Sequence, residues 1–320
     1  MNTETHASFP IDAVITWVDG NDPVLAAKRN SFLPDKTFAA IDDIAGATRY
    51  TERGEIHWCI RSINKFMPWI RRIFIITDGQ NPHIKSRIPV EIIDHSVIFR
   101  GYEQYLPMFC SVSIEAMMWR IPGLSEHFVY FNDDFLVCRR VSPEIFFPQE
   151  GHIKCHAHLA SIWWTETRYF VKRLFGHSRR VNHVRRMMAA ARITGSRNTF
   201  IRLSHTPYPM LKSTMQLFYE QHPERLEQNL RNRFRSTEHF RNDELVYMLL
   251  RKKGCLQIAP VHDVLMEYMP HGGIKRLERK LRRVTRPGSQ VCFICFGSLD
   301  KATDDIFLCI SNFVEELLKE

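Results

Sequence analysis

The chain has 320 residues, of which 44% are hydrophobic and 25% are charged, a composition that excludes an intrinsically disordered protein. It contains no apolar run of about 18 residues, so no segment is expected to span a bilayer. The first residues lack the basic and apolar stretches of a secretory signal, and none is expected. The length allows one large domain or two of ordinary size.

The net charge of +9 is unevenly distributed along the chain. Residues 151–290 hold 27 lysines and arginines against 10 acidic residues, so this region has a surplus of 17 and the remainder a net charge of −8. A basic field attracts polyanions such as nucleic acid, anionic lipid or a phosphorylated polymer. The sign of the charge alone does not distinguish these partners.

Eight cysteines are scattered along the chain, most of them within apolar strings. This distribution is typical of core cysteines in a reducing cytosol. Cys292 and Cys295 have CxxC spacing, but no second pair accompanies them, so zinc binding or redox work is only a weak hypothesis.

Strands and helices are predicted to alternate in the first half of the chain. Apolar strings predict strands at 11–18, 72–77, 90–94 and 128–131. Apolar residues at helical spacing predict helices at 55–66 and 111–119. We therefore expect an α/β fold with a mostly parallel, Rossmann-like sheet and helices on both faces.

Three regions follow from these patterns. Residues 1–150 would form the α/β lobe, 151–290 a basic and mainly helical second lobe, and 291–320 a strand and a helix that pack back on the core. Within the second lobe, helices are predicted at 165–192, 210–222 and 245–250. The basic run at 276–286 is expected to be flexible.

Polar side chains directly follow the apolar strand at 128–131. Asn132, Asp133 and Asp134 would lie at the carboxyl edge of the sheet, where open α/β sheets bind ligands. Adjacent oxygen ligands suit Mg²⁺ or Mn²⁺, ions that are usually shared with a nucleotide diphosphate. A solvated turn is the other interpretation of this motif on its own. Asp19 and Asp78 also follow predicted strands, in Asp-Gly pairs that either bind a nucleotide or merely form turns.

Several stretches together resemble the Stealth family of sugar-phosphate transferases, which includes bacterial capsular polysaccharide phosphotransferases and the α/β subunit of the lysosomal-enzyme GlcNAc-1-phosphotransferase. The first block is residues 11–22, and the second, dense and specific, is residues 55–135. The second block contains Arg61-Ser62-Ile63, Ile76-Thr77-Asp78-Gly79-Gln80, Leu106-Pro107-Met108-Phe109, Ile114-Glu115 and Asn132-Asp133-Asp134. A third block comprises Ser204-His205-Thr206-Pro207 and Arg233-Phe234-Arg235, and a weak fourth covers 291–305.

The resemblance implies transfer of a hexose 1-phosphate, with an N-acetylhexosamine 1-phosphate as the expected group, from a UDP-sugar to a hydroxyl of a growing capsular or cell-surface polysaccharide. The product would be a phosphodiester and the leaving group UMP. Such phosphoryl transfer needs charge neutralisation and an oriented nucleophile more than covalent catalysis.

The resemblance also implies roles for particular residues. His205 would be the acid/base group, Arg235 would bind phosphoryl oxygens, and Glu115 would lie beside the metal or orient the acceptor. Asp134 completes this catalytic set. The ligands of Mg²⁺ (or Mn²⁺) would be Asn132, Asp133 and Asp134. The nucleotide pocket of the 1–150 lobe would be formed by Trp17, Val18, Asp19, Gly20, Asn21, Arg61 and Asp78.

The chain departs from the family pattern at two places. Cys110 stands where many bacterial members have Asn, and Phe296-Gly297 stands where the fourth block often carries Asn-Asp. The arginine of the third block is either Arg235 or Arg241, because Phe-Arg occurs at both places. The Ser-Thr-Glu that follows Arg235 favours Arg235.

Two other functions compete with this one. A metal-dependent glycosyltransferase would use a similar acidic site but release UDP. A nucleic-acid-binding protein would use the basic lobe, but no nucleic-acid motif accompanies it and the first lobe is acidic, so no nucleic-acid partner is expected. A phosphodiester-linked acceptor is itself a polyanion, which accounts for the basic surface. The expected location is the bacterial cytoplasm, and the charge is compatible with a peripheral contact to the inner membrane or capsule export machinery.

Overall fold

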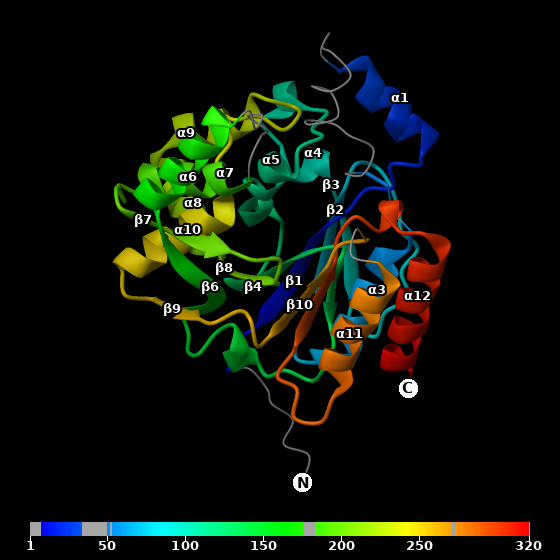
Figure 1. The fold of residues 1–320 in the computed structure, drawn as a ribbon. Coiled ribbons are helices and arrows are strands. Elements are labelled where there is room, and N and C mark those ends of the chain that lie inside the picture. Colours follow the sequence, from blue (N-terminus) through cyan, green and yellow to red (C-terminus); the bar gives the residue numbers. More distant parts are fainter. Residues whose placement is uncertain (1–7, 34–49, 52, 176–182, 271–272, 320) are drawn as a thin grey trace.

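A five-stranded sheet with the strand order β3-β2-β1-β4-β8 forms the centre of the computed structural model, which describes residues 8–33, 50–51, 53–175, 183–270 and 273–319 (Figure 1). The strands are β1 (Ile11–Thr16), β2 (Ile73–Thr77), β3 (Val90–Asp94), β4 (His127–Asn132) and β8 (Tyr208–Leu211). The first four pair in parallel, and β8 runs antiparallel to β4. The predicted α/β class with a mostly parallel sheet is confirmed.

The order of strands in this sheet reverses at β1. After β1 the chain adds β2 and β3 on one side, and β4 then pairs with the other side of β1. Such a switch point leaves a crevice at the carboxyl ends of the strands. Residues 128–131 of β4 are almost completely buried, as expected of a parallel strand that is covered on both faces.

Helices lie on both sides of the central sheet. In Figure 1, α3, α11 and α12 lie together on the right and α6 to α10 on the left. The helices are α1 (Pro23–Ser31), α3 (Glu55–Phe66), α4 (His95–Ile98), α5 (Ser111–Glu115), α6 (Ile162–Leu174), α7 (His183–Ile193), α8 (Lys212–Gln221), α9 (Pro223–Leu230), α10 (Asn242–Lys252), α11 (Ile274–Thr285) and α12 (Asp304–Leu318). Short 3₁₀ turns are η2 (Glu103–Tyr105), η3 (Met118–Arg120), η4 (Pro143–Ile145) and η6 (Leu299–Lys301). Across the described ranges, we find no helix whose length and apolar content would let it cross a membrane.

The predicted helix at 111–119 is shorter in the structure. It ends at Glu115 and is followed by the 3₁₀ turn η3. Ala116, Met117 and Met118 are all fully buried, so their apolar character reflects burial on every side and not one face of a longer helix.

Residues 151–290 carry helices α6 to α11, but they also form strands that the sequence analysis did not predict. They contribute the three-stranded sheet β7-β6-β9, made of β6 (Ile153–Ser161), β7 (Thr199–Leu203) and β9 (Leu256–Ala259). A further sheet, β10-β11-β5, joins β10 (Leu265–Tyr268) to β11 (Phe293–Phe296) and β5 (Phe135–Val137). In β6 the buried face is carried by Cys155 and Ala157 beside Ile153, which give only a weak apolar signal.

The three regions share one apolar core. Ile15 of the first region, Phe200 and Leu245 of the second and Phe293 of the third belong to the same buried cluster. Strand β8 also extends the central sheet of the first lobe, even though it contains Pro209. Proline is tolerated there because β8 is the last strand of the sheet.

The basic run at 276–286 is ordered as a helix, and the prediction of a flexible segment is wrong. Helix α11 buries Leu277, Leu281 and Val284, which follow one another at helical spacing. The basic side chains occupy its other faces. Three apolar residues on one stripe are enough to pack a helix whose remaining surface is charged.

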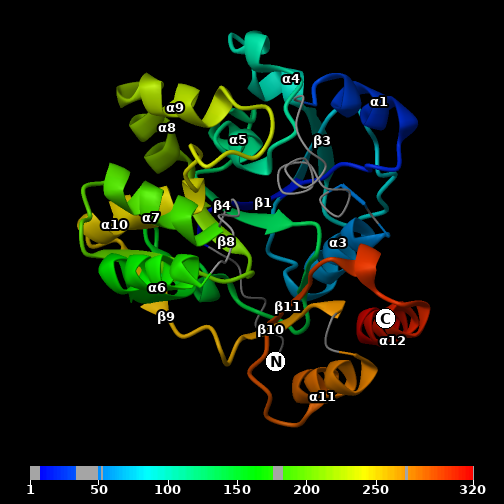
Figure 2. The ribbon, with the colours of Figure 1, turned by 45° about the horizontal axis from the view of Figure 1, so that its top comes forward.

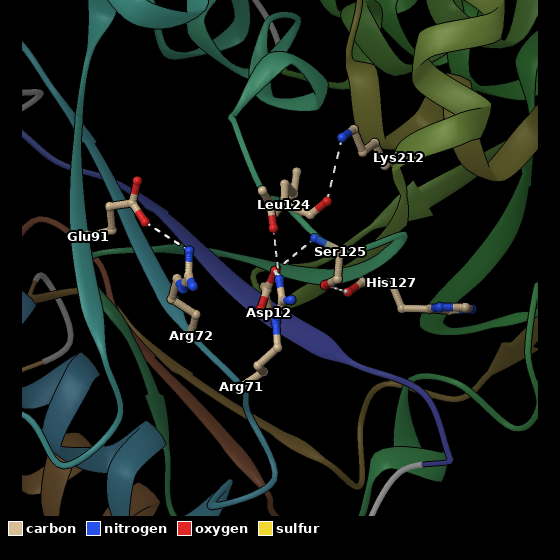
Figure 3. Close-up of polar contacts among 9 residues, drawn as sticks. Asp12, Arg71, Arg72, Glu91, Leu124, Ser125, His127 and Lys212 are labelled. Carbon is tan, nitrogen blue, oxygen red and sulfur yellow. Dashed lines mark hydrogen bonds and ion pairs between the residues drawn. The ribbon is translucent and has the colours of Figure 1, made fainter.

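A buried carboxylate joins the elements at the amino ends of the central strands (Figure 3). Asp12 of β1 is fully buried and accepts hydrogen bonds from Arg71 at 2.9 Å and 2.6 Å. Its Oδ2 also accepts from the backbone N–H of Ser125 at 2.8 Å. Nearby, Arg72 contacts Glu91 at 3.0 Å at the surface. This network lies at the edge of the sheet opposite the switch-point crevice.

Candidate active site

A cavity of about 210 Å³ lies at the carboxyl ends of β1, β2 and β4. It occupies the crevice at the switch point of the sheet, the place where open α/β sheets bind ligands. The structure brings together in its lining five residues predicted for nucleotide and metal binding: Trp17, Val18, Asp78, Asn132 and Asp133. These residues come from the ends of three strands.

The loop after β1 forms the wall behind this cavity. The backbone N–H of Asp19 donates to Gln80 at 2.9 Å, and its carboxylate accepts from the N–H of Asn21 at 2.8 Å. Gly20 donates its N–H to the backbone oxygen of Tyr50 at 2.7 Å. A Cβ atom on Gly20 would lie 2.3 Å from Cβ of Tyr50, so the contact requires glycine. Asp19, Gly20 and Asn21, which were predicted to form the nucleotide pocket, are not among the described lining residues. Their contacts instead fix the loop that carries the lining residues Trp17 and Val18.

A neutral histidine lies on the β2–β3 side of the cavity. His95 lines the cavity, and burial lowers its pKa to about 4. Its Nδ1 atom has no hydrogen-bond partner within the described parts of the chain. Asp78, also in the lining, forms an ion pair with Lys28 at 2.7 Å. This side of the cavity thus combines a carboxylate whose charge is neutralised by Lys28 with an uncharged imidazole.

Asp134 continues the acidic motif into the interior. Its Oδ2 accepts a hydrogen bond from Sγ of Cys295 at 3.5 Å, and its buried Oδ1 has no protein partner in the described ranges. Burial raises the pKa of Asp134, an effect that His205 opposes when its ring is protonated. A buried carboxylate oxygen without a partner is the kind of group that a cation would satisfy.

His205 is held by a carboxylate that the sequence did not reveal. Its Nδ1 lies 2.5 Å from Oε1 of Glu267, and its ring stacks on that of His183 with centroids 5.7 Å apart. The hydrogen bond to Glu267 raises the pKa of His205, and the charge of Asp134 adds to this effect. The same bond lowers the pKa of Glu267. The only signal in the sequence was a single carboxylate within the short apolar string Leu265-Met266-Glu267-Tyr268.

Glu115 lies below the cavity in a chain of hydrogen bonds. Tyr130 of β4 donates to Glu115 at 3.3 Å, and its hydroxyl also lies 2.9 Å from Oγ1 of Thr16. Burial raises the pKa of Glu115, and the charge of Arg241 opposes this increase. Since Thr16 lines the cavity, Glu115 is connected to the site through Tyr130.

The two candidate arginines have different environments. Arg241 is buried and donates two hydrogen bonds to Asp243, one at 2.8 Å from Nε to Oδ1. Its guanidinium also lies 3.1 Å from Nδ1 of His183. Arg241 is therefore committed to an internal ion pair.

Arg235 is half-buried and follows a residue that contacts the cavity lining. The preceding Phe234 stacks on the cavity residue Phe109 with ring centroids 5.1 Å apart. Cys110 follows Phe109 and lies 3.5 Å from Nδ1 of His239. Burial opposes ionisation of Cys110, yet the hydrogen bond with His239, aided by the charge of Arg235, lowers the pKa of Cys110 to about 7.

The structure does not place Arg61 beside the other predicted site residues. It lies on α3 and forms a two-pronged ion pair with Glu315 of α12, at 2.7 Å and 2.9 Å. It is absent from the described lining of the cavity. Its predicted contact with the nucleotide is therefore not supported by its position, because α3 turns Arg61 towards α12.

A metal ion would have to use few protein ligands here. The described residues contain no group of three or more His, Cys, Asp and Glu side chains arranged to hold one. Mg²⁺ commonly takes only one or two carboxylates and completes its shell with phosphate and water. Asp133 in the cavity lining and Asp134, with its unpartnered oxygen, fit that requirement.

The fold and this site define an α/β protein with a cavity at the switch point of a parallel sheet. Residues 9–37 match the family model described as Stealth protein CR1, conserved region 1, and residues 49–155 match Stealth protein CR2, conserved region 2. A receptor polysaccharide phosphotransferase of Streptococcus gordonii is 34% identical over 249 residues, which cover 71% of this chain and 73% of that protein. The chain belongs to the Stealth family.

Other relatives match over shorter segments. A capsular polysaccharide phosphotransferase of Actinobacillus pleuropneumoniae is 40% identical over 49% of this chain, and an exopolysaccharide phosphotransferase of Streptomyces coelicolor is 42% identical over 47%. The matches span only 41% and 28% of those two longer proteins. Among solved structures, the galactosyltransferase LgtC with donor and acceptor sugar analogues aligns over 96% of this chain and 95% of its own, with a TM-score of 0.47 and 11% identity.

Proposed function

We propose that this protein transfers a hexose 1-phosphate, most simply an N-acetylhexosamine 1-phosphate, from a UDP-sugar to a hydroxyl of a capsular or cell-surface polysaccharide. The reaction forms a phosphodiester and releases UMP. Membership of the Stealth family and the polysaccharide phosphotransferase names of its relatives support the class of reaction.

One observation carries the assignment to this site. The acidic motif after β4 begins in the lining of the switch-point cavity and ends at Asp134. The charge of Asp134 raises the pKa of His205, which is hydrogen-bonded to Glu267. The cavity, the carboxylates that would hold a cation and the histidine that would accept a proton would together form one site. Phosphoryl transfer between a nucleotide donor and an alcohol requires these three parts.

The nucleotide would occupy the cavity against Trp17, Val18 and Asp78, with the loop at 19–21 as its support. Asn132, Asp133 and Asp134 would hold Mg²⁺ or Mn²⁺. The bound ion would neutralise charge on the diphosphate oxygens. Arg235 would bind non-bridging oxygens of the transferred phosphoryl group through its guanidinium.

His205 would accept the proton of the attacking hydroxyl. A carboxylate can only accept hydrogen bonds, so Nδ1 of His205 carries the proton shared with Glu267 and Nε2 is the basic atom. The acceptor oxygen forms a bond to the phosphorus next to the sugar, and the bond from that phosphorus to the bridging oxygen breaks. UMP leaves with the bridging oxygen, and the proton remains on His205.

The acceptor and the location are part of this proposal. A phosphodiester-linked polysaccharide is anionic, which suits the charge surplus of residues 151–290. All eight cysteines are free thiols, as is usual for proteins of the reducing cytoplasm, where the UDP-sugar would be available. A nucleic-acid partner is not needed to account for the basic surface.

Chromatography of the released nucleotide tests this function. The purified protein is incubated with Mg²⁺, a short capsule-type acceptor and UDP-GlcNAc or UDP-ManNAc, and an Asp133→Asn variant serves as control. UMP formed in step with acceptor extension supports sugar-phosphate transfer. Release of UDP would replace the proposal with glycosyl transfer. Turnover of neither donor by the wild type, with equal background in the variant, would count against both UDP-N-acetylhexosamines.

A further inference from the structure

Helix α6 presents its apolar side chains to solvent. Trp163 and Trp164 are each 63% exposed, Leu174 is 66% exposed, and Phe175, directly after the helix, is 76% exposed. Phe170 and Val171 are exposed as well. A surface helix normally turns such residues towards the core, so this helix has the opposite arrangement.

These side chains form one continuous stripe. At 100° per residue, positions 163, 164, 167, 170, 171, 174 and 175 fall within an arc of about 140°. The rest of the helix anchors it to the protein. Ile162 is buried, and Glu166 forms an ion pair with Arg192 of α7 at 2.6 Å. The ring of Tyr169 lies under the guanidinium of Arg185 at 5.3 Å. The apolar stripe is therefore held outwards by a helix that is fixed on its inner side.

Positive charge accompanies this stripe. Arg168 and Lys172 are exposed along its edge. Tryptophan and phenylalanine are favoured at the boundary between lipid headgroups and acyl chains, and lysine and arginine are attracted to anionic headgroups. Aromatic, aliphatic and basic groups thus share one exposed surface.

We propose that α6 is an interfacial helix that docks this protein on an anionic lipid bilayer, with its apolar stripe at the level of the acyl chains. A second copy of the chain would place equal basic edges against each other. A polysaccharide would stack on the aromatic rings but would not require the aliphatic Val171 and Leu174. An anionic lipid surface would bury the apolar stripe and attract the basic residues along its edge. This inference is independent of the proposed reaction.

Vesicle co-sedimentation tests the inference with a matched control. The probe is vesicles of phosphatidylglycerol and phosphatidylcholine in equal amounts, compared with phosphatidylcholine alone. The double variant Trp164→Gln/Leu174→Gln should bind roughly tenfold more weakly than wild type. Leu308→Gln should bind like wild type, because Leu308 is 60% exposed on α12 at the opposite side of the molecule from α6 (Figure 2). Arg168→Gln should weaken binding to the anionic vesicles only.

Circular dichroism and turnover of a short soluble acceptor should be unchanged in all of these variants. Absence of wild-type binding to the vesicles would overturn the inference. Equal binding of the wild type and the double variant would also overturn it, because charge alone would then account for the binding. A wild-type dimer that the double variant dissociates in size-exclusion chromatography, without vesicle binding, would assign the stripe to a second copy. A selective loss of turnover on long soluble acceptors, again without vesicle binding, would assign it to the polysaccharide.

Discussion

Nδ1 of His205 lies 2.5 Å from Oε1 of Glu267, a residue 62 positions later in the chain. Glu267 is in β10, opposite Cys295 of β11, whose Sγ donates to Asp134. The pairing of these two strands therefore connects His205, the proposed acid/base group, to the acidic motif after β4. Neither strand belongs to the parallel sheet that carries the motif.

Replacing Glu267 with Gln should lower the pKa of His205, because the carboxylate raises it in the wild type. The limb of the pH–rate profile that His205 controls should move to lower pH, and kcat should fall roughly tenfold. An NMR titration of the His205 ring, assigned with a His205→Asn variant, measures the shift directly. An unchanged titration would remove Glu267 from the positioning role.

The same pair should make stability depend on pH. The pKa of His205 is raised and that of Glu267 is lowered on folding. Their contribution is therefore fully present between the unfolded pKa values of about 4.3 for Glu and about 6.5 for His. It is lost as pH rises through the folded pKa of His205 or falls through that of Glu267. The difference in urea midpoint between wild type and Glu267→Gln should follow this window, and a constant difference would contradict it.

If the proposed Mg²⁺ or Mn²⁺ takes part in the reaction, chelation of divalent cations should abolish turnover and their restoration should recover it. Asp133→Asn and Asp134→Asn should each reduce kcat by about a hundredfold or more, because both would neutralise the charge of a metal ligand. Paramagnetic resonance of Mn²⁺ titrated in the presence of UMP measures the ion without relying on activity. The exposed Asp305→Asn on α12 is the control. Mn²⁺ binding that is equal in all variants would refute this site.

Strands β1, β2 and β4 of the central sheet could be predicted from the sequence because they are buried on both faces and appear as apolar strings. Strands β6 and β8 lack that signal. In β6 the buried positions are held by Cys155 and Ala157, and β8 contains Pro209. Helix α11 was not predicted for another reason. Charged residues dominate the composition of this segment, whereas its packing depends on three buried apolar residues.

The part of the candidate site that directly follows the ends of the strands could be predicted from the sequence. Trp17, Asp78 and Asp133 come directly after three parallel strands, and parallel strands end at one edge. Glu267 was not predictable because its role arises from the pairing of β10 with β11. Arg61 lies within a matching family block, but a motif does not specify which neighbour a helical side chain meets. Here that neighbour is Glu315 of α12.

Arg235→Lys and Arg241→Lys should have different consequences. Arg235→Lys should lower kcat about tenfold or more with little change in melting temperature, since a lysine cannot reproduce a two-pronged contact to phosphoryl oxygens. Arg241→Lys should lower the free energy of unfolding by about 2 kcal/mol, because it disturbs a buried pair with Asp243. Parallel measurement of kcat and thermal unfolding separates the two effects. A purely catalytic loss in Arg241→Lys would reverse the assignment.

Two adjacent arginines allow a test of the network at the amino ends of the strands. Arg71 and Arg72 have similar side-chain exposure, 41% and 38%, but Asp12, the partner of Arg71, is fully buried, whereas Glu91, the partner of Arg72, is 43% exposed. Arg71→Gln should reduce the free energy of unfolding by about 2 kcal/mol, since it removes charged hydrogen bonds to a carboxylate that cannot reach water. Arg72→Gln should cost about 0.5 kcal/mol or less, as is usual for surface ion pairs. Urea denaturation of both variants measures the difference. Equal losses would show that the burial of Asp12 does not decide the strength of this contact.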